Sequence, residues 1–259
     1  MVMYDDTTIV RGSFDLNYIS EYLLQAQWAE LIELKKVITQ VSHKKQRPVT
    51  ILDIGIGNAR IVKHLSGIKD TWQLIEKYDG TDNAEACVDL SKQVIQELGI
   101  TDKVNVYLFD AKNLEAWQQQ YDLIICTWFT PGNFYPDDFS FDKYNPQQNR
   151  LDLSHNPSFE SVFSAAYKHL HTGGEIVLGA CYLDNNATRL KQEESYKKMG
   201  MTIITDEFDS FTATQQGFWS QRFTKEKLQH YLSFAAPENI HITALDTYDY
   251  AIQVRVQAI

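Results

Sequence analysis

The sequence predicts an α/β fold in which a mostly parallel sheet is covered by helices on both faces. Two observations lead to this prediction. Short apolar runs alternate along the chain with stretches whose apolar residues recur at helical spacing, which is typical of parallel sheets joined by crossover helices. In addition, three successive apolar runs end in an aspartate, at Asp53, Asp82 and Asp110, and a glycine-rich turn directly follows the first run.

Residues 50–59 are the most informative stretch of the chain. An apolar run ends in Asp53 and is followed by Gly55 and Gly57, after which a helical pattern begins that Gly67 ends. Glycine allows the backbone to turn sharply and lets a ligand approach without a Cβ in the way. The stretch therefore predicts a strand, a tight turn and a helix that together bind a nucleotide.

Two nucleotide fingerprints compete for this turn. The dinucleotide pattern G-x-G-x-x-G, counted from Gly55, places its third glycine at Arg60, whose bulk would obstruct close helix–strand packing. The pattern acid-x-G-x-G-x-small fits Asp53, Gly55, Gly57 and Ala59 instead, and it resembles motif I of the class I S-adenosylmethionine-dependent methyltransferases. The sign of charge agrees, because a pyrophosphate favours bare amides and cations whereas carboxylates can offset a sulfonium and an ammonium.

The second and third strand patterns extend the resemblance. Residues 76–83 are expected to form a strand that ends in an acid, and residues 104–111 another. An acid at the end of the second strand can accept hydrogen bonds from both ribose hydroxyls, and the resemblance implies that Asp110 faces the adenine amino group and that Asn83 lies against the ring. A single aspartate here could equally be a helix cap or a turn residue, but that alternative is poor for all three. The predicted cofactor-binding residues are Asp53, Gly55, Gly57, Asn58, Asp82, Asn83, Asp110, Ala111 and Cys126.

The alternation continues to the end of the chain. Asn156 and Pro157 match a helix cap followed by proline at the first helical position, and Gly173 with Gly174 is expected to end that helix. Further strands are predicted at residues 121–129, 175–181, 240–245 and 250–256, and a late helix at residues 224–232. The resemblance implies a doubly wound, mostly parallel seven-stranded sheet whose last strand is antiparallel, with an N-terminal helical cap and an insertion after strand five.

A single domain over residues 1–259 is the natural division at this length. It consists of an N-terminal helical segment at 1–47, a cofactor-binding core at 48–181, an insertion and substrate region at 182–223, and a C-terminal helix and strand pair at 224–259. The N-terminal segment is expected to form amphipathic helices that cover an edge of the sheet. The resemblance also implies that such a segment covers the bound cofactor, so that Tyr18 and Tyr22 would contact the cofactor.

The acceptor is expected to lie between two aromatic-rich segments. Trp128 and Phe129 follow the fourth strand, and Trp219 and Arg222 belong to the insertion. Aromatics with a few polar groups commonly line ligand pockets, which makes these four residues candidate substrate contacts. The alternative for the insertion is an extra strand pair whose aromatics form a core, and the sequence leaves both readings open.

An oxygen or nitrogen acceptor must lose a proton, and histidine is the commonest base near neutral pH. Most of the seven histidines fall in surface-like helices or beside helix ends. His155 lies in the loop after the fourth strand, on the side where the donor methyl should point, and Tyr135 in the same loop is the fallback. The alternative for His155 is an exposed loop residue beside the Asn156 cap.

Composition narrows the class of protein further. A net charge of −10 without any long basic patch argues against a nucleic-acid partner. No run approaches the ~20 apolar residues that a membrane span needs, and the first residues show no secretion signal. Cys87, Cys126 and Cys181 fall on apolar faces, so they are expected to be free buried thiols of a cytoplasmic protein.

The segment after strand four narrows the reaction class mainly because motifs of other methyltransferase classes are absent from it. It carries neither an Asn/Asp-Pro-Pro-aromatic motif nor the acids of a magnesium-dependent O-methyltransferase, and no zinc spacing occurs. The sequence thus predicts an S-adenosylmethionine-dependent methyltransferase that acts on O or N of a small molecule without a metal. A protein or RNA methyltransferase, a non-catalytic S-adenosylmethionine-binding or partner protein, and an NAD(P) oxidoreductase are the alternatives, the last disfavoured by Arg60.

Overall fold

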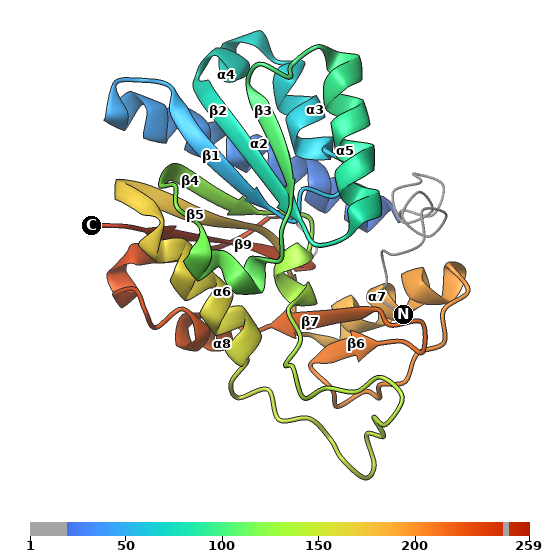
Figure 1. Ribbon diagram of the computed structural model, residues 1–259. Coiled ribbons are helices and arrows are strands. Elements are labelled where there is room, and N and C mark those ends of the chain that lie inside the picture. Colours follow the sequence, from blue (N-terminus) through green and yellow to red (C-terminus); the bar gives the residue numbers. More distant parts are fainter. Residues whose placement is uncertain (1–19, 246–248) are drawn as a thin grey trace.

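A sheet with the strand order β3-β2-β1-β4-β5-β9-β8 forms the centre of the protein in a computed structural model, which describes residues 20–245 and 249–259 (Figure 1). Strands β1 to β5 pair in parallel, and β9 runs antiparallel to both β5 and β8. The predicted seven-stranded arrangement with an antiparallel last strand is therefore confirmed. These strands are β1 (Val49–Ile54), β2 (Ile75–Asp82), β3 (Val104–Leu108), β4 (Tyr121–Cys126), β5 (Leu170–Leu183), β8 (Ile240–Ala244) and β9 (Ala251–Gln257).

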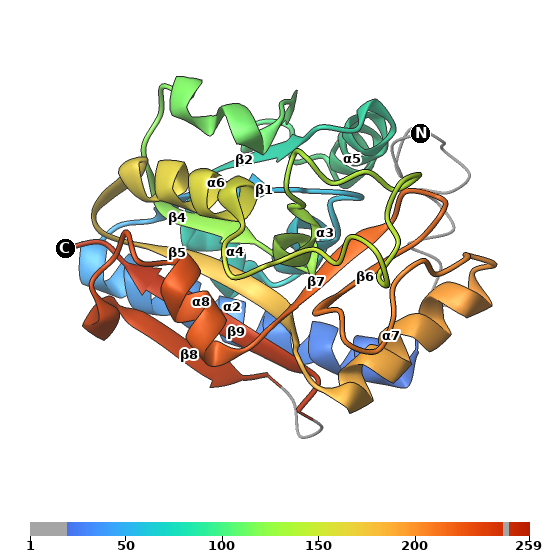
Figure 2. The same cartoon turned by 90° about the horizontal axis from the view of Figure 1, so that it is seen from below.

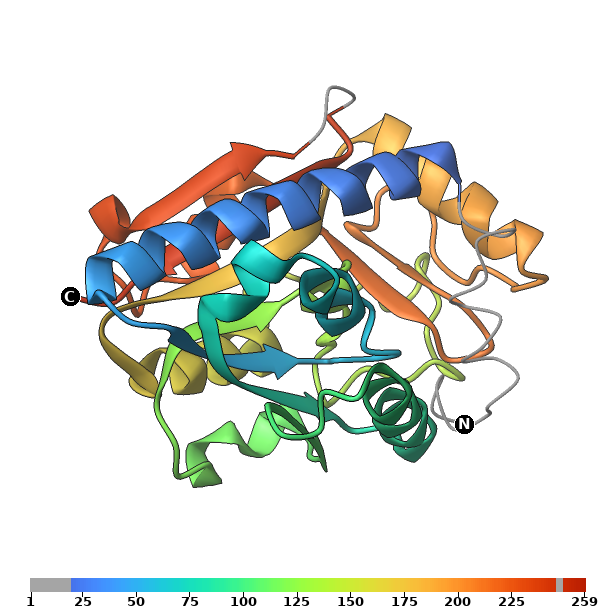
Figure 3. The same cartoon turned by 90° about the horizontal axis from the view of Figure 1, so that it is seen from above.

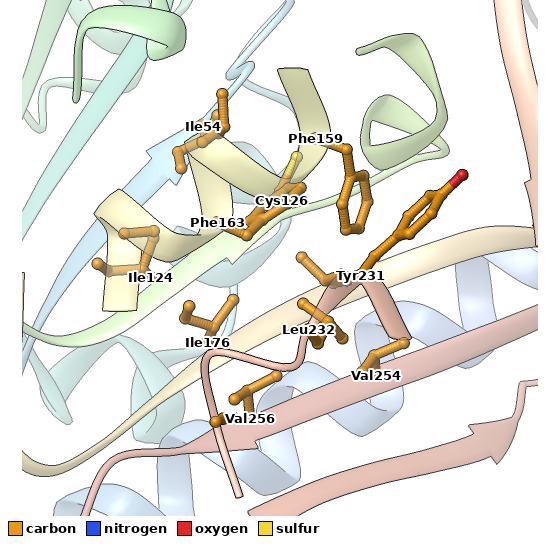
Figure 4. Packing of buried hydrophobic residues seen from close by; sticks show 14 of the residues in the cluster. Ile54, Ile124, Cys126, Phe159, Phe163, Ile176, Tyr231, Leu232, Val254 and Val256 are labelled. Atoms are coloured by element: carbon orange, nitrogen blue, oxygen red, sulfur yellow. The ribbon is translucent and has the colours of Figure 1, made fainter. Parts of the chain in front are cut away.

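Side chains alternate along each strand, so apolar residues project from both faces of the sheet, and helices cover both faces. Ile51 of β1 packs with one set of helices, whereas its neighbour Leu52 belongs to the cluster on the other face. The first face carries α2 (Glu21–Lys45), α3 (Arg60–Ser66), α4 (Lys69–Gln73) and α5 (Glu85–Leu98). The second carries η1 (Ala111–Ala116), α6 (Pro157–Lys168) and α8 (Lys225–Tyr231), and Figure 4 shows how α6 and the end of α8 pack on the strands. The short 3₁₀ helix η3 (Pro237–Asn239) precedes β8 and has no buried residue.

The N-terminal segment differs from its prediction. Among the described residues it forms one helix, α2, that lies across the face of the sheet over β1, β4 and β5 rather than along an edge (Figure 3). The reason is the apolar stripe of Leu34, Val37, Ile38 and Val41, which is completely buried. A stripe of this length is wide enough to cover several strands.

The end of α6 also differs from its prediction. The helix ends at Lys168, and Gly173 and Gly174 lie inside β5 instead of stopping the helix. Leu170 already pairs with Tyr121, and the register between β4 and β5 then shifts before Leu123. Gly173 has a φ of +71°, so the glycines supply the irregular backbone that this shift requires.

The insertion after β5 consists of α7 (Asn186–Lys198) and the hairpin of β6 (Phe211–Ala213) and β7 (Trp219–Phe223). It joins the sheet through β7, which pairs in parallel with the last two residues of β5, Tyr182 and Leu183. Tyr182 also pairs with Ala251 of β9, so β7 must occupy the opposite edge of β5. That is the edge along which β4 pairs up to Cys126, and the hairpin therefore stands over the carboxyl end of β4 (Figure 2).

Candidate functional site

The glycine turn after β1 is held close to its neighbours. Gly55 and Gly57 have φ of +79° and +58°, which suits glycine, and Ala59 enters α3 with a φ of +56°. The Gly55 amide donates to the Thr81 carbonyl oxygen over 2.8 Å. A Cβ on Gly55 would lie 2.6 Å from Cγ2 of Thr130, so this position requires glycine for both its backbone angle and its space.

Asp82, at the end of β2, faces this turn. Its Oδ2 accepts from the Gly57 amide over 3.0 Å and its Oδ1 from the Ala84 amide over 3.0 Å. Burial raises the pKa of Asp82, although both amides oppose the shift. A carboxylate oxygen can accept two hydrogen bonds, so each oxygen keeps capacity for a hydroxyl donor. Asn83 beside it is exposed.

Asp110 and Ala111 lie two and three residues beyond β3. Asp110 caps the 3₁₀ helix η1, and its Oδ1 accepts from the Lys112 amide over 3.0 Å. The capping role that the sequence left as an alternative is thus present. Ala111 is buried at 8% exposure, and Asp110 remains partly open beside it.

Asp53 lies beneath the turn on the face that α2 covers. Its side chain is 1% exposed and accepts from the Tyr78 hydroxyl over 2.6 Å through Oδ2, while Oδ1 has no hydrogen-bond partner in the described part of the chain. Burial raises the pKa of Asp53 to about 7; the charge of Glu30 adds to this shift, whereas the Tyr78 hydroxyl and Arg60 oppose it.

Glu30 is a site residue that the sequence reasoning did not identify. This residue of α2 is fully buried, and its Oε1 accepts from the Trp128 amide over 2.8 Å. Burial raises the pKa of Glu30, opposed by the charge of Arg60 and by the Trp128 and Ala180 amides. The sequence does hold a signal, since Glu30 interrupts the apolar stripe between Ala26 and Leu34 and buried acids require partners.

Arg60 completes this group of buried charges. Its Nη2 lies 3.7 Å from Oε2 of Glu30, and its guanidinium carbon lies 3.8 Å from the centre of the Trp128 ring. Burial lowers the pKa of Arg60 to about 10, with Glu30 and Asp53 opposing the shift. The side chain thus contacts both Glu30 and the Trp128 ring. We call Glu30, Asp53, Arg60 and Tyr78 the buried charge cluster.

The turn after β4 has an unusual backbone. Trp128 and Phe129 have φ of +54° and +60°, a left-handed conformation that costs about 1–3 kcal/mol for each non-glycine residue. The Phe129 amide donates to the Ala180 carbonyl oxygen over 2.9 Å. The Phe129 ring stacks on Tyr182 with centroids 3.8 Å apart. Such strain typically persists at functional sites, where the surroundings hold it in place.

A comparison with known proteins identifies the family to which this chain belongs. A family model described as a methyltransferase domain matches residues 45–236, which is most of the chain. The chain belongs to this family. It is accordingly an S-adenosylmethionine-dependent methyltransferase. No curated protein matches it.

Solved structures share the fold of this methyltransferase. An S-adenosylmethionine-dependent methyltransferase from Clostridium acetobutylicum ATCC 824 has 13% identity and a TM-score of 0.55, with 97% of this chain and 95% of that chain covered. Magnesium protoporphyrin IX methyltransferase from Synechocystis PCC 6803, solved with bound SAH, has 12% identity and a TM-score of 0.53 over 98% of this chain and 100% of that chain. At these identities the likeness concerns the fold.

The residues around the turn fit the methyl donor of this family. The donor carries a sulfonium and an ammonium, and Asp53 has one buried carboxylate oxygen without a hydrogen-bond partner among the described residues. The corresponding oxygen of Glu30 lies 3.7 Å from Arg60. Asp82 has accepting capacity for a ribose diol at the end of β2. The glycines leave the approach to the turn free of Cβ atoms.

Cys126 and Tyr22 lie at the margins of this site. The Cys126 side chain points into the apolar core between β4 and α6 (Figure 4), which leaves its backbone as the part available to a ligand. Burial raises the pKa of its thiol, and all three cysteines are free and buried as predicted. Tyr22 packs near Phe129 and Tyr250, with Lys191 Nζ 3.6 Å from its ring centre. Tyr18 lies outside the described residues.

Trp219 and Arg222 lie on β7, over the end of β4, and both are buried. Trp219 is 2% exposed and stacks on Phe211 with centroids 3.9 Å apart. Arg222 is 1% exposed and donates to Gln192 over 2.8 Å and to Thr212 over 2.7 Å. Both side chains are thus packed as the strand-pair alternative describes, and their contact with an acceptor stays a prediction.

The segment after η2 (Thr130–Asn133) brings Tyr135 onto this hairpin. Tyr135 packs in one cluster with Trp219 and Phe139, and Lys112 of η1 lies 5.4 Å from its ring centre. His155 has different neighbours. Its side chain is 62% exposed, and its Nδ1 lies 3.2 Å from Nε2 of His230 on α8 and 3.4 Å from Glu160 on α6. Neither of its partners belongs to the glycine turn or to the buried charge cluster.

No group of three His, Cys, Asp or Glu side chains comes together in residues 20–245 and 249–259 in a way that could hold a metal ion. Within the same ranges, no helix has the length and apolar character needed to cross a membrane.

Proposed function

We propose that this methyltransferase transfers the methyl group of S-adenosylmethionine to an oxygen or nitrogen atom of a small molecule. The observation that carries the proposal is the position of the β6–β7 hairpin, which covers the carboxyl end of β4 with its own aromatic cluster. A net charge of −10 further disfavours a polyanionic acceptor. The chain itself therefore covers the acceptor side, where a large partner would need an open surface.

The donor is assigned to the edge formed by the ends of β1, β2 and β3. Asp82 accepts from the ribose hydroxyls, and Asn83, Asp110 and Ala111 surround the adenine. Gly55, Gly57 and Asn58 offer close backbone approach, and Asp53 offsets positive charge beneath the turn. The support for these roles is that Asp53 lies in β1 directly before the glycine turn, Asp82 accepts from the Gly57 amide of that turn, and Asp110 follows the neighbouring strand β3.

The chemistry required of the protein is mainly alignment. When bound, S-adenosylmethionine supplies a methyl group on a reactive sulfonium. The side chains must then hold the acceptor in line with that methyl group and exclude water. We assign this task to Trp128 and Phe129; the support is that their turn lies at the end of β4, directly before Thr130, which lies against Gly55. Trp219 and Arg222 would complete the acceptor wall.

Calorimetry with S-adenosylhomocysteine and NADH tests the donor assignment. We expect S-adenosylhomocysteine to bind and NADH to give no heat above dilution, because Arg60 replaces the third glycine of the dinucleotide pattern and carboxylates face the site. Tight binding of NADH with no response to S-adenosylhomocysteine would reject the assignment.

The acceptor class requires a separate experiment. The protein is incubated with S-adenosylmethionine labelled in its methyl group and a cell extract divided into small molecules, proteins and RNA. We expect the label in the small-molecule fraction, in a form that survives removal of the donor. Label confined to the protein or RNA fraction would overturn the small-molecule proposal.

Of the two candidate bases, Tyr135 has a neighbour that adjoins the proposed donor-binding residues. Its neighbour Lys112 follows Asp110 and Ala111 directly, whereas the partners of His155 lie on α6 and α8. We therefore assign proton removal to Tyr135. Tyr135→Phe should lower turnover of the acceptor roughly 10- to 100-fold, the lower end of what a positioned base contributes.

His155→Ala is the matched control for this prediction. It should leave turnover within a few-fold, and both variants should keep the wild-type dissociation constant for S-adenosylhomocysteine. The reverse pattern, with His155→Ala impaired and Tyr135→Phe active, would return the role to the histidine.

A further inference from the structure

Glu30 joins three elements that approach the proposed donor site from different parts of the chain. It belongs to α2, its Oε1 accepts from the Trp128 amide in the turn after β4, and its Oε2 faces Arg60 at the start of α3. Arg60 in turn lies against the Trp128 ring. These three residues thus form a closed set of contacts that includes the turn on one side and the end of the glycine segment on the other.

The space around Glu30 is shaped for its carboxylate. A Cβ on Gly179 of β5 would overlap the Glu30 side chain, so β5 leaves room for the acid by having no side chain there. Glu30 is fully buried, and a buried acid is costly unless it is hydrogen-bonded and paired. Helix packing alone would be served better by an apolar residue at this place in the stripe of α2.

The turn that Glu30 contacts needs such support. Trp128 and Phe129 are consecutive non-glycine residues in the left-handed region, and the surrounding structure must hold that conformation. Thr130, the next residue, is the one that lies against Gly55. A shift of the turn would therefore move a side chain that touches the donor's glycine turn.

We propose that Glu30 is a positioning residue for methyl transfer, which fixes the turn after β4 against the glycine turn by accepting the Trp128 amide hydrogen. The inference rests on the proposed function, because the site it positions is the proposed donor and acceptor site. Glu30 acts through Trp128 and Thr130 and does not itself need to touch the donor. The N-terminal helix is in this way part of the site.

Two substitutions separate the reach of Glu30 from its charge. Glu30→Gln keeps the length of the side chain and an oxygen for the Trp128 amide but removes the charge. Glu30→Asp keeps the charge beside Arg60, which favours folding, but is too short to reach that amide. Glu33→Gln on the same helix is the control, since the partly exposed Glu33 carboxylate pairs with Lys36 over 2.7 Å.

The measurements are amide hydrogen exchange in peptides that contain Trp128 and calorimetry with S-adenosylhomocysteine. We expect Glu30→Asp to speed exchange at Trp128 and to raise the dissociation constant roughly tenfold, about the loss of one hydrogen bond to a charged group. Glu30→Gln should restore slow exchange and keep affinity within about threefold of wild type. Glu33→Gln should change neither quantity.

Three results would overturn the proposal. Wild-type exchange in Glu30→Asp would show that the carboxylate does not fix the turn. Fast exchange with unchanged affinity would reduce Glu30 to a purely structural role. Glu30→Gln as impaired as Glu30→Asp would assign the effect to charge instead of reach. If the wild-type protein bound no S-adenosylhomocysteine, the proposed function would fail, and the exchange contrast would still report separately on the Glu30 contact.

Discussion

Asp53→Asn is expected to flatten the pH dependence of stability and to make the protein more stable than wild type above pH 7. Burial raises the pKa of Asp53 from 3.8 to about 7, so the folded state holds this proton more tightly than the unfolded state. The stability it contributes is complete below pH 4 and is lost as pH rises to about 7. At ~1.4 kcal/mol per pH unit, the loss approaches ~4 kcal/mol as an upper limit.

Denaturant unfolding at pH 5, 6, 7 and 8 measures this difference. Asparagine keeps an oxygen for the Tyr78 hydroxyl, so the variant loses the charge and little else. Some slope should remain from Glu30, whose pKa burial also raises. Tyr78→Phe is the complementary variant, because the Tyr78 hydroxyl lowers the pKa of Asp53. Its removal should raise that pKa further, so that stability continues to fall up to a higher pH. Parallel pH curves for wild type and Asp53→Asn would contradict the assignment.

Asp82→Ala should raise the dissociation constant for S-adenosylhomocysteine between about 10²- and 10⁴-fold. In the proposed site this carboxylate accepts two hydroxyl hydrogens of the ribose, each bond to a charged group contributing ~1.5–3 kcal/mol, and ~1.4 kcal/mol corresponds to one decade. The carboxylate also accepts from the Gly57 amide, so its loss loosens the glycine turn as well. Isothermal calorimetry on the folded variant measures the effect.

Two further variants complete this test. Asp82→Asn keeps one accepting oxygen and should fall between wild type and alanine. Asp89→Ala removes an exposed acid from the neighbouring helix α5 and should bind as wild type does. A well-folded Asp82→Ala protein with wild-type affinity would remove Asp82 from the donor site.

Much of the fold could be predicted because the determining signals are local. Apolar runs that end in Asp53 and Asp82 mark strands and their ends, and Gly99 ends α5 with a left-handed φ of +66°, as glycine caps commonly do. Asn156 caps α6 by accepting from the Phe159 amide over 3.2 Å. Each of these features depends on residues within one or two turns of the chain.

What the sequence could not supply depends on contacts between distant segments. Glu30 lies 98 residues before its partner Trp128, and only the packing of α2 across the sheet brings them together. Gly173 looked like a helix stop, but the pairing of Leu170 with Tyr121 draws it into β5. The left-handed residues Trp128 and Phe129 could not be predicted, because neither is a glycine. Contacts with neighbouring segments hold their conformation.

The short attachment of the β6–β7 hairpin bears on how this enzyme can diversify. The hairpin pairs with β5 through two residue pairs, Tyr182 with Arg222 and Leu183 with Phe223, beyond the last pair that β5 makes with β4. The glycine turn, Asp53, Asp82 and Asp110 lie in or shortly after β1, β2 and β3, on the other side of that boundary. Under the proposed function, changes in the length or side chains of the hairpin would alter the choice of acceptor while the strands of the proposed donor site stay unchanged. This junction is therefore the place at which to introduce a different specificity.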